Sequence, residues 1–178
     1  FADESRNLEA YLHAGGKLVM IGSNIMQSFM DDSYYLIAPC EPCITYPAKF
    51  SSSGWNWFMN EILHINFGYI GDLIGNFNSA EGINQYSGLV LNPDTSKIAD
   101  IWPNYNKLSN VDVVIEPGGF TVPILKLNSD DNYVDQKACG VRYYGSGFDV
   151  IYIGAPIWHM EAEDAKLLGE KILEDMDF

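Results

Sequence analysis

The three cysteines are the residues whose spacing most directly suggests chemistry. Cys40 and Cys43 form a C-x-x-C pair within Pro-Cys-Glu-Pro-Cys, and Cys139 stands alone much later in the chain. Such a pair can be a redox centre, half of a zinc site or a local disulfide. The redox alternative needs the pair at the start of a helix, whereas prolines surround it here. A four-ligand zinc site needs further partners, and the chain offers only 3 histidines and no second C-x-x-C.

A structural disulfide between Cys40 and Cys43 in a secreted protein is the interpretation that we favour. The odd count leaves one cysteine free unless it pairs elsewhere. We expect this residue, Cys139, to be a small buried apolar side chain within a strand.

The chain is strongly acidic. Its 178 residues carry 24 Asp and Glu against 10 Lys and Arg, a formal net charge of −14. Since this charge repels a phosphate backbone, we predict no nucleic-acid partner. Acidic chains with few lysines suit a saline or calcium-containing exterior. Asp31-Asp32 and Asp130-Asp131-Asn132 could bind calcium weakly, but both lack the spacing of a calcium loop, so we expect solvated turns and predict no metal or cofactor.

Length and hydrophobicity predict a single domain over residues 1–178. Hydrophobic residues make up 47% of the chain, enough for a packed core. No apolar run approaches the roughly 18–20 residues that cross a bilayer, so we predict no membrane span. The chain begins at Phe1 and opens directly into a helix-like stretch. We therefore expect that the chain is a piece of a longer polypeptide and that the rest of that polypeptide is a partner of this domain. If an upstream strand is missing, one edge of the sheet would be left exposed.

In the first third of the chain, the apolar spacing predicts a helix over residues 2–14 that ends at Gly15-Gly16. The nearly unbroken apolar run 17–21 predicts a strand covered on both faces. A long loop over 31–53 carries the cysteine pair, and Ser53 is expected to cap a helix over 54–63.

The middle and end of the chain predict a different mixture. We expect an irregular insertion over about 64–110, with short strand candidates near 73–77 and 88–91. Strands follow over 111–115 and 121–127, and a hairpin joins 138–144 to 148–153 around Gly145-Ser146-Gly147. The final helix, 161–176, turns Ala165, Leu168, Ile172 and Met176 inward. Strands interleaved with helices predict an α/β layered sheet with helices on both faces and an antiparallel C-terminal hairpin.

Both ends of the chain resemble a known family. Leu8 to Gly22, LEAYLHAGGKLVMIG, resembles the L-x-x-Y-L-x-x-G-G-x-L-x-x-x-G stretch of class I glutamine-amidotransferase-like domains. It is most similar to the divergent members found in large secreted bacterial proteins. Val150 to Gly154, with the helix after it, is similar to the family's C-terminal strand and helix. The resemblance implies a flavodoxin-like, mostly parallel sheet and an extracellular, cell-surface or periplasmic bacterial location.

The resemblance also implies where catalytic residues would lie. Catalytic members carry a nucleophilic cysteine on a sharp turn after a strand and a His-x-Glu after the last strand. Here Ser23 occupies the cysteine position, and His159-Met160-Glu161 matches the His-x-Glu. A Ser23–His159–Glu161 triad, with backbone N–H groups near Asn24 as the oxyanion hole, would make a serine hydrolase. The alternative is structural, with Ser23 as a helix cap and Glu161 as an acid in the first helical turn.

A further hypothesis concerns the aromatic residues, since sugar rings stack on exposed aromatic faces. The candidates for a carbohydrate cleft are Trp55, Trp57, Phe58, Trp102, Tyr105, Tyr143 and Tyr144. The helical spacing of Trp55 and Phe58 favours a core position for both. The sharp turn after the first strand carries Ser23 in place of the family's nucleophilic cysteine. We therefore favour a non-catalytic accessory, binding or interaction domain of a secreted or surface protein. A serine hydrolase and a carbohydrate-binding module are the alternatives, and the ligand would be a protein or a carbohydrate.

Overall fold

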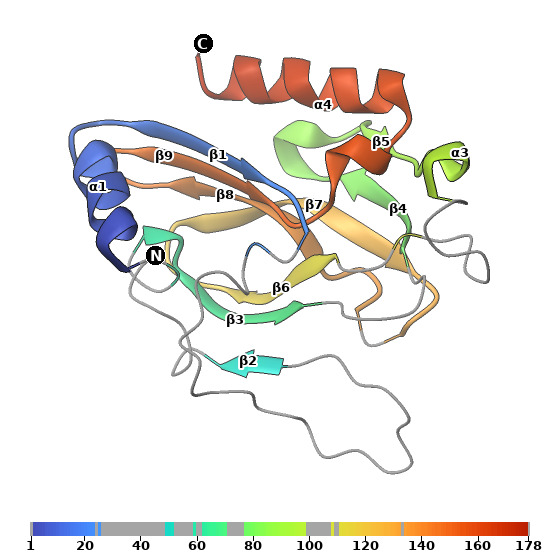
Figure 1. Cartoon of the computed structure of the whole chain (residues 1–178), viewed down its shortest axis with the longest axis horizontal. Helices are drawn as coiled ribbons and strands as arrows, with labels where there is room; N and C mark the ends of the chain where they lie inside the picture. Colours follow the sequence, from blue (N-terminus) through green and yellow to red (C-terminus); the bar gives the residue numbers. More distant parts are fainter. Residues whose placement is uncertain are drawn as a thin grey trace.

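The computed structural model describes residues 2–23, 25, 49–51, 59, 62–70, 77–98, 108, 111–132 and 134–177. These residues form a mixed α/β fold around one curled, mostly antiparallel sheet (Figure 1). Its strands are β1 (Lys17–Ile21), β2 (Lys49–Ser51), β3 (Ile65–Ile70), β4 (Phe77–Gly82), β5 (Val90–Leu91), β6 (Asp112–Pro117), β7 (Thr121–Ser129), β8 (Ala138–Tyr144) and β9 (Asp149–Ile153). The helices are α1 (Ala2–His13), α3 (Thr95–Ile98) and α4 (Ala162–Asp175), with 3-10 turns η3 (Asn84–Tyr86) and η4 (Ile157–His159).

The sheet runs in the order β2-β3-β6-β8-β7-β4-β5, and β9 joins β8 to β1. Within the described residues β1 and β9 form the one parallel pair, and every other pair of strands is antiparallel. Ile21 lies opposite Ile153 at the carboxyl end of the parallel pair, and Lys17 lies opposite Asp149 at its amino end. This pair therefore has two distinct ends, each with its own set of polar side chains.

The sheet forks at β8. Strand β9 pairs with β8 from Tyr144 back to Gly140, and β6 then pairs with β8 at Ala138. Gly154 lies at the fork, where its N–H donates to the carbonyl of Cys139 (2.8 Å) and its carbonyl accepts from the N–H of Asp112 (2.9 Å). A Cβ on Gly154 would lie 2.3 Å from the carbonyl oxygen of Asp112, so the close approach of β6 requires a glycine here.

Two helices cover opposite faces of the β1–β9 pair, because the side chains of each strand alternate between the faces. On one face Leu168 and Ile172 of α4 share a core cluster with Ile151, Ile153 and Cys139. Figure 1 shows α4 as a layer above the strands. On the other face Leu12 of α1 shares a second cluster with residues of β8 and β9, namely Val141, Tyr143, Val150 and Tyr152.

The helices and strands predicted at both ends of the chain are confirmed. Helix α1 ends at a left-handed Gly15 (φ 89°), and Gly16 donates to the carbonyl of Tyr11 (3.1 Å). Strand β1 and the β8–β9 hairpin occupy the predicted segments. In α4, Leu168, Ile172 and Met176 are buried, as the periodicity predicted.

The prediction of a mostly parallel sheet is not confirmed. Apolar runs indicate burial on both faces, but they do not reveal strand direction. The decisive signal is the short connections β6–β7, β7–β8 and β8–β9, since a parallel crossover needs a dozen or more residues. The strands of the β1–β9 pair come from opposite ends of the chain, and theirs is the one parallel pairing among the described residues.

The segment 64–110, expected to be an irregular insertion, contributes β3, β4 and β5 to the same sheet. Val90–Leu91 coincides with one of the two strand candidates. Strand β4 has the sequence FNSAEG, which contains few residues that favour strands. It forms a strand because it pairs along the long strand β7, from Phe77 opposite Ser129 to Gly82 opposite Leu125.

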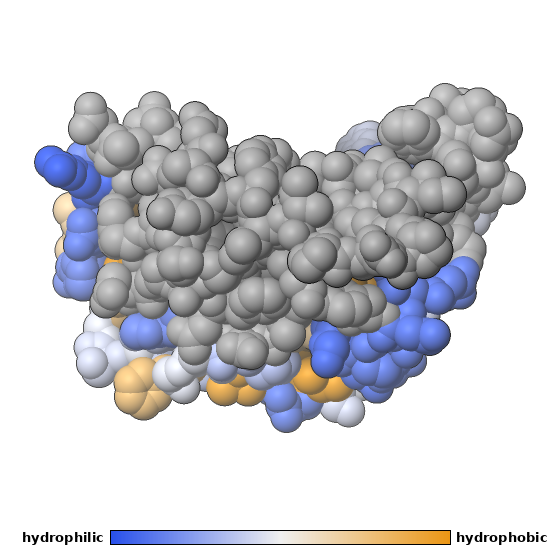
Figure 2. Space-filling model, turned by 90° about the horizontal axis from the view of Figure 1, so that it is seen from below, coloured by the Kyte–Doolittle hydropathy of each residue, from blue (hydrophilic) through white to orange (hydrophobic). Residues whose placement is uncertain are grey.

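Several predictions lie outside the described residues: Cys40, Cys43 and their disulfide, the loop 31–48, and most of the helix expected over 54–63. None of the helices in the described part combines the length and apolar character needed to cross a bilayer. On the face seen in Figure 2, the hydrophobic residues of the described part lie apart from one another among hydrophilic ones.

Candidate functional site

The structure places Ser23 and His159 at the same edge of the sheet. Parallel strands carry their carboxyl ends to one edge, and the N–H of Gly22 donates to the carbonyl of Ile153 (3.0 Å) where β1 and β9 end. Ser23 follows β1 directly, and His159 closes η4, the turn after β9. In open α/β sheets this edge is where ligands bind.

Main-chain hydrogen bonds fix the backbone around His159. The N–H of Asp94 donates to the carbonyl of His159 (2.8 Å), and the N–H of Glu161 donates to the carbonyl of Asn92 (2.9 Å). The ammonium of Lys97 donates to the carbonyl of Met160 (2.9 Å). The segment 159–161 is therefore held against the loop that leads into α3.

The three predicted catalytic side chains are not joined to one another. Nδ1 of His159 is buried and has no hydrogen-bond partner among the described residues. Glu161 is exposed, occupies the N-cap position of α4, and its side chain makes no cap hydrogen bond. A triad needs the acid to hold the imidazole and the imidazole to reach the nucleophile. Neither hydrogen bond is present in the part of the chain that the structure describes.

A buried carboxylate at this edge escaped the sequence analysis. Asp112 is fully buried at the start of β6, and its Oδ2 accepts a hydrogen bond from the hydroxyl of Tyr152 (2.5 Å). The available signal was a single acid within the apolar run VDVVI. Buried carboxylates need paired hydrogen bonds, and Tyr152 supplies one.

Cys139 is buried and free, as predicted. Burial in the core cluster raises the pKa of its thiol to about 12. Because the thiolate is the reactive form, Cys139 is a packing residue rather than a nucleophile.

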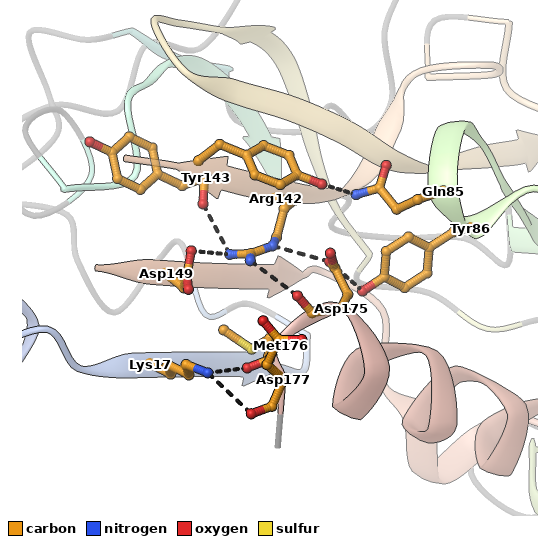
Figure 3. A network of polar contacts seen from close by, with 10 residues as sticks. Lys17, Gln85, Tyr86, Arg142, Tyr143, Asp149, Asp175, Met176 and Asp177 are labelled. Carbon is orange, nitrogen blue, oxygen red and sulfur yellow. Dashed lines mark hydrogen bonds and ion pairs between the residues drawn. The ribbon is translucent and has the colours of Figure 1, made fainter. Parts of the chain in front are cut away.

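The opposite edge, at the amino ends of β1 and β9, holds a connected polar network (Figure 3). Its centre is Arg142 on β8, whose side chain is only 3% exposed. The guanidinium forms ion pairs with Asp149 of β9 and Asp175 at the end of α4, each at 3.1 Å, and donates to the carbonyl of Tyr143 (3.1 Å). Asp175 also accepts from the hydroxyl of Tyr86 (3.1 Å).

The same network binds the end of α4 to the first strand. The ammonium of Lys17 donates to the carbonyls of Met176 and Asp177, the latter at 3.3 Å. These carbonyls lie at the C-terminus of α4, where the helix dipole favours a cation. The hydroxyl of Tyr144 accepts a hydrogen bond from Gln85, and the ring of Tyr144 lies 4.8 Å from the guanidinium carbon of Arg142. Burial, followed by the charge of Asp175, raises the pKa of Tyr144, so its hydroxyl stays protonated at neutral pH.

The aromatic residues proposed for a carbohydrate cleft have different outcomes. Tyr143 is buried between the rings of His64 and Phe148, each at 4.9 Å. It therefore cannot be a platform. Tyr144 is 41% exposed. The sequence analysis did not single out three further exposed rings, Tyr11 (52%), Phe120 (66%) and Trp158 (77%). Trp55, Trp57, Phe58, Trp102 and Tyr105 lie outside the described residues.

The described residues contain no group of three His, Cys, Asp or Glu side chains that could hold a metal ion. Asp130, in one of the two acidic stretches, accepts a hydrogen bond from Asn78 (2.7 Å), and Asp31-Asp32 lies outside the described part.

No protein-family model matches the chain, and no curated protein matches it. The geometry above is therefore the basis for any statement about function.

Proposed function

We propose that this chain is a non-catalytic binding or interaction domain of a secreted or surface protein. In this proposal it is a divergent form of the glutamine-amidotransferase-like domain, and the β1–β9 pair with α1 and α4 is the part that retains the flavodoxin-like layering. The rest of a longer polypeptide and a protein or carbohydrate ligand are its partners. The disulfide between Cys40 and Cys43 belongs to the same proposal.

The state of His159 carries the proposal. A general base needs one ring nitrogen held by an acid and the other directed at the nucleophile. In the described residues Nδ1 of His159 is buried and unpartnered, and Glu161 is exposed to solvent. Ser23 stands where the family carries its cysteine, which removes the thiolate chemistry of the catalytic members.

A serine hydrolase is the second candidate, because one observation favours it. The parallel pairing of β1 with β9 brings Ser23 and His159 to one edge of the sheet, as a triad would require. Catalytic hydrogen bonds can be long before substrate binds, so the arrangement deserves a direct chemical test.

A fluorophosphonate probe, which labels activated serines, separates the two candidates. We expect no labelling of the folded wild-type chain, and the same result for Ser23→Ala and His159→Ala. Labelling of the wild type that is lost in both variants would replace the proposed function with the hydrolase. A folded, active serine hydrolase run in parallel shows that the probe is competent.

A further inference from the structure

Two residues with exposed aromatic side chains, Phe120 and Tyr144, are neighbours across the β7–β8 ladder at the amino edge of the β1–β9 pair. Thr121 pairs with Tyr143 in the β7–β8 ladder, so Phe120 comes opposite Tyr144, and the N–H of Tyr144 donates to the carbonyl of Phe120 (3.0 Å). Directly opposite residues of antiparallel strands point to the same face. Phe120 is 66% exposed and Tyr144 is 41% exposed, so both rings are presented to solvent.

Contacts hold the ring of Tyr144 and the backbone that carries Phe120. The ring of Tyr144 lies against the guanidinium of Arg142, which is itself held by two carboxylates, and Gln85 donates to the hydroxyl of Tyr144. Phe120 sits in a tight turn, in which the N–H of Thr121 donates to the carbonyl of Gly118 (3.1 Å). A ring that is already held, as that of Tyr144 is, loses little conformational entropy when a ligand covers it.

Polar groups continue the row across the sheet. Asp149 pairs with Tyr144 on the other side of β8, and Lys17 pairs with Asp149 in turn. The row therefore reads Phe120, Tyr144, Asp149, Lys17 on the face where α4 ends. Figure 3 shows Gln85, Arg142 and Asp149 gathered on this side of the sheet. Two neighbouring aromatic side chains followed by amide, carboxylate and ammonium groups suit a ligand with one apolar face and a hydroxylated edge.

Size and charge restrict the ligand further. A stable protein interface buries about 800 Å² on each partner, much more than two side chains provide. The chain carries a formal charge of −14, which disfavours an acidic ligand. Within the row, Arg142 and Lys17 are already matched by Asp149, Asp175 and the last carbonyls of α4.

We propose that Phe120 and Tyr144 form a stacking platform for a neutral carbohydrate, with Asp149 and Gln85 at its hydrogen-bonding rim. The inference rests on the proposed binding function and names the ligand class and site for it. The pyranose rings of a neutral polysaccharide stack on the two aromatic faces, and their hydroxyls meet the polar rim.

Affinity electrophoresis tests this site. The whole chain is run in native gels containing hydroxyethyl cellulose, galactomannan, xylan, mixed-linkage glucan or, as the acidic member, polygalacturonate. We expect retardation by at least one neutral polymer and none by polygalacturonate. Phe120→Ala should weaken the retarding interaction about tenfold, and Tyr144→Ala by at least as much, whereas Tyr144→Phe, which keeps the ring, should retain most of it.

Trp158→Ala is the matched control, because it removes a strongly exposed ring from the carboxyl edge of the same strand pair. It should bind as the wild type does. Circular dichroism confirms the fold of each variant, and Phe120→Ala, at an exposed turn, carries the test if Tyr144→Ala does not fold. Retardation by no neutral polymer, retardation by polygalacturonate, or loss of binding in Trp158→Ala alone would each overturn the platform. None of these outcomes affects the proposed non-catalytic function, which the fluorophosphonate result decides.

Discussion

The amino and carboxyl ends of the β1–β9 pair differ in how their polar side chains are paired. At the amino end Arg142 is matched by Asp149 and Asp175, and Lys17 is matched by the last carbonyls of α4. At the carboxyl end the main chain of residues 159–161 makes the hydrogen bonds, to the backbone of Asn92 and Asp94 and to the ammonium of Lys97, and Nδ1 of His159 has no partner among the described residues. Side-chain pairing holds the first edge together, and main-chain pairing holds the second.

This difference implies that the side chains at the amino end contribute more to the stability of the fold than those at the carboxyl end. A buried, satisfied ionic network is expensive to disturb because removing one member leaves another charge buried without its partner. An edge held by the backbone can change its side chains at little energetic expense. Substitutions at the two ends should therefore differ strongly in their effect on the free energy of unfolding.

The largest effect is expected for Arg142→Met. The substitution leaves Asp175 largely buried beside Tyr86 and without its cation, and loss of one partner of a buried pair typically costs about 3–5 kcal/mol. Since the side chain of Asp149 is 34% exposed, we expect the lower end, about 3 kcal/mol. Urea unfolding measures this loss.

The control for this prediction is Lys166→Met on α4. Lys166 and Glu170 form an exposed pair at 4.0 Å, so its loss should change the free energy of unfolding by less than about 0.5 kcal/mol. If the two substitutions lowered the free energy of unfolding equally, the ion pairs of Arg142 would contribute no more to stability than an exposed pair on the surface.

An intermediate effect is expected for Gly154→Ala at the fork. Its Cβ would lie 2.3 Å from the carbonyl oxygen of Asp112, so β6 and β9 would have to separate, and we expect a loss of about 1–3 kcal/mol. Gly169→Ala on α4 is the matched control, because a Cβ there meets nothing within 4 Å. It should stabilise the helix by up to about 1 kcal/mol. Thermal unfolding of the two variants should shift in opposite directions, and a shift in the same direction would contradict the close approach at the fork.

The smallest effect is expected for His159→Met. Replacing a buried nitrogen that has no partner in the described part of the chain with an apolar group of similar size should be neutral or slightly stabilising, within about 0.5 kcal/mol. Urea unfolding at pH 7 is the measurement. A loss above about 2 kcal/mol would show that His159 contributes to the fold through its ring, and the contrast between the two ends would then fail.

The sequence predicted the local elements well where the chain's own pattern decides them. Gly15 marks the end of α1, the loop at Gly145–Gly147 marks the β8–β9 hairpin, and the periodicity of Leu168 and Ile172 marks the buried face of α4. Each signal lies within a few residues of the feature that it predicts. Strand direction and the role of 64–110 were missed, because pairing with β6 and β7 decides them and those strands lie far along the chain.

The candidate site was predictable in part for the same reason. The positions of Ser23 and His159 follow from two strand ends, but whether their side chains meet depends on η4 and its bonds to the loop before α3. Arg142 and Asp112 each lie beside apolar residues in the sequence, a pattern that predicts burial with a partner but does not name the partner. The platform at Phe120 and Tyr144 depends on the register of two strands and could not be inferred from composition.

Arg142 also restricts how β8 can align with its neighbours. Strand β8 contacts β7, β9 and β6, so an alignment error of one residue would disturb all three contacts at once. Such a slip turns every side chain to the other face, which would place the guanidinium among the apolar residues of the second core cluster, such as Leu12 and Val150. An unpaired charge in that cluster costs several kcal/mol. A charge in the middle of an apolar strand thus excludes the alternative pairings that a uniformly apolar strand would tolerate.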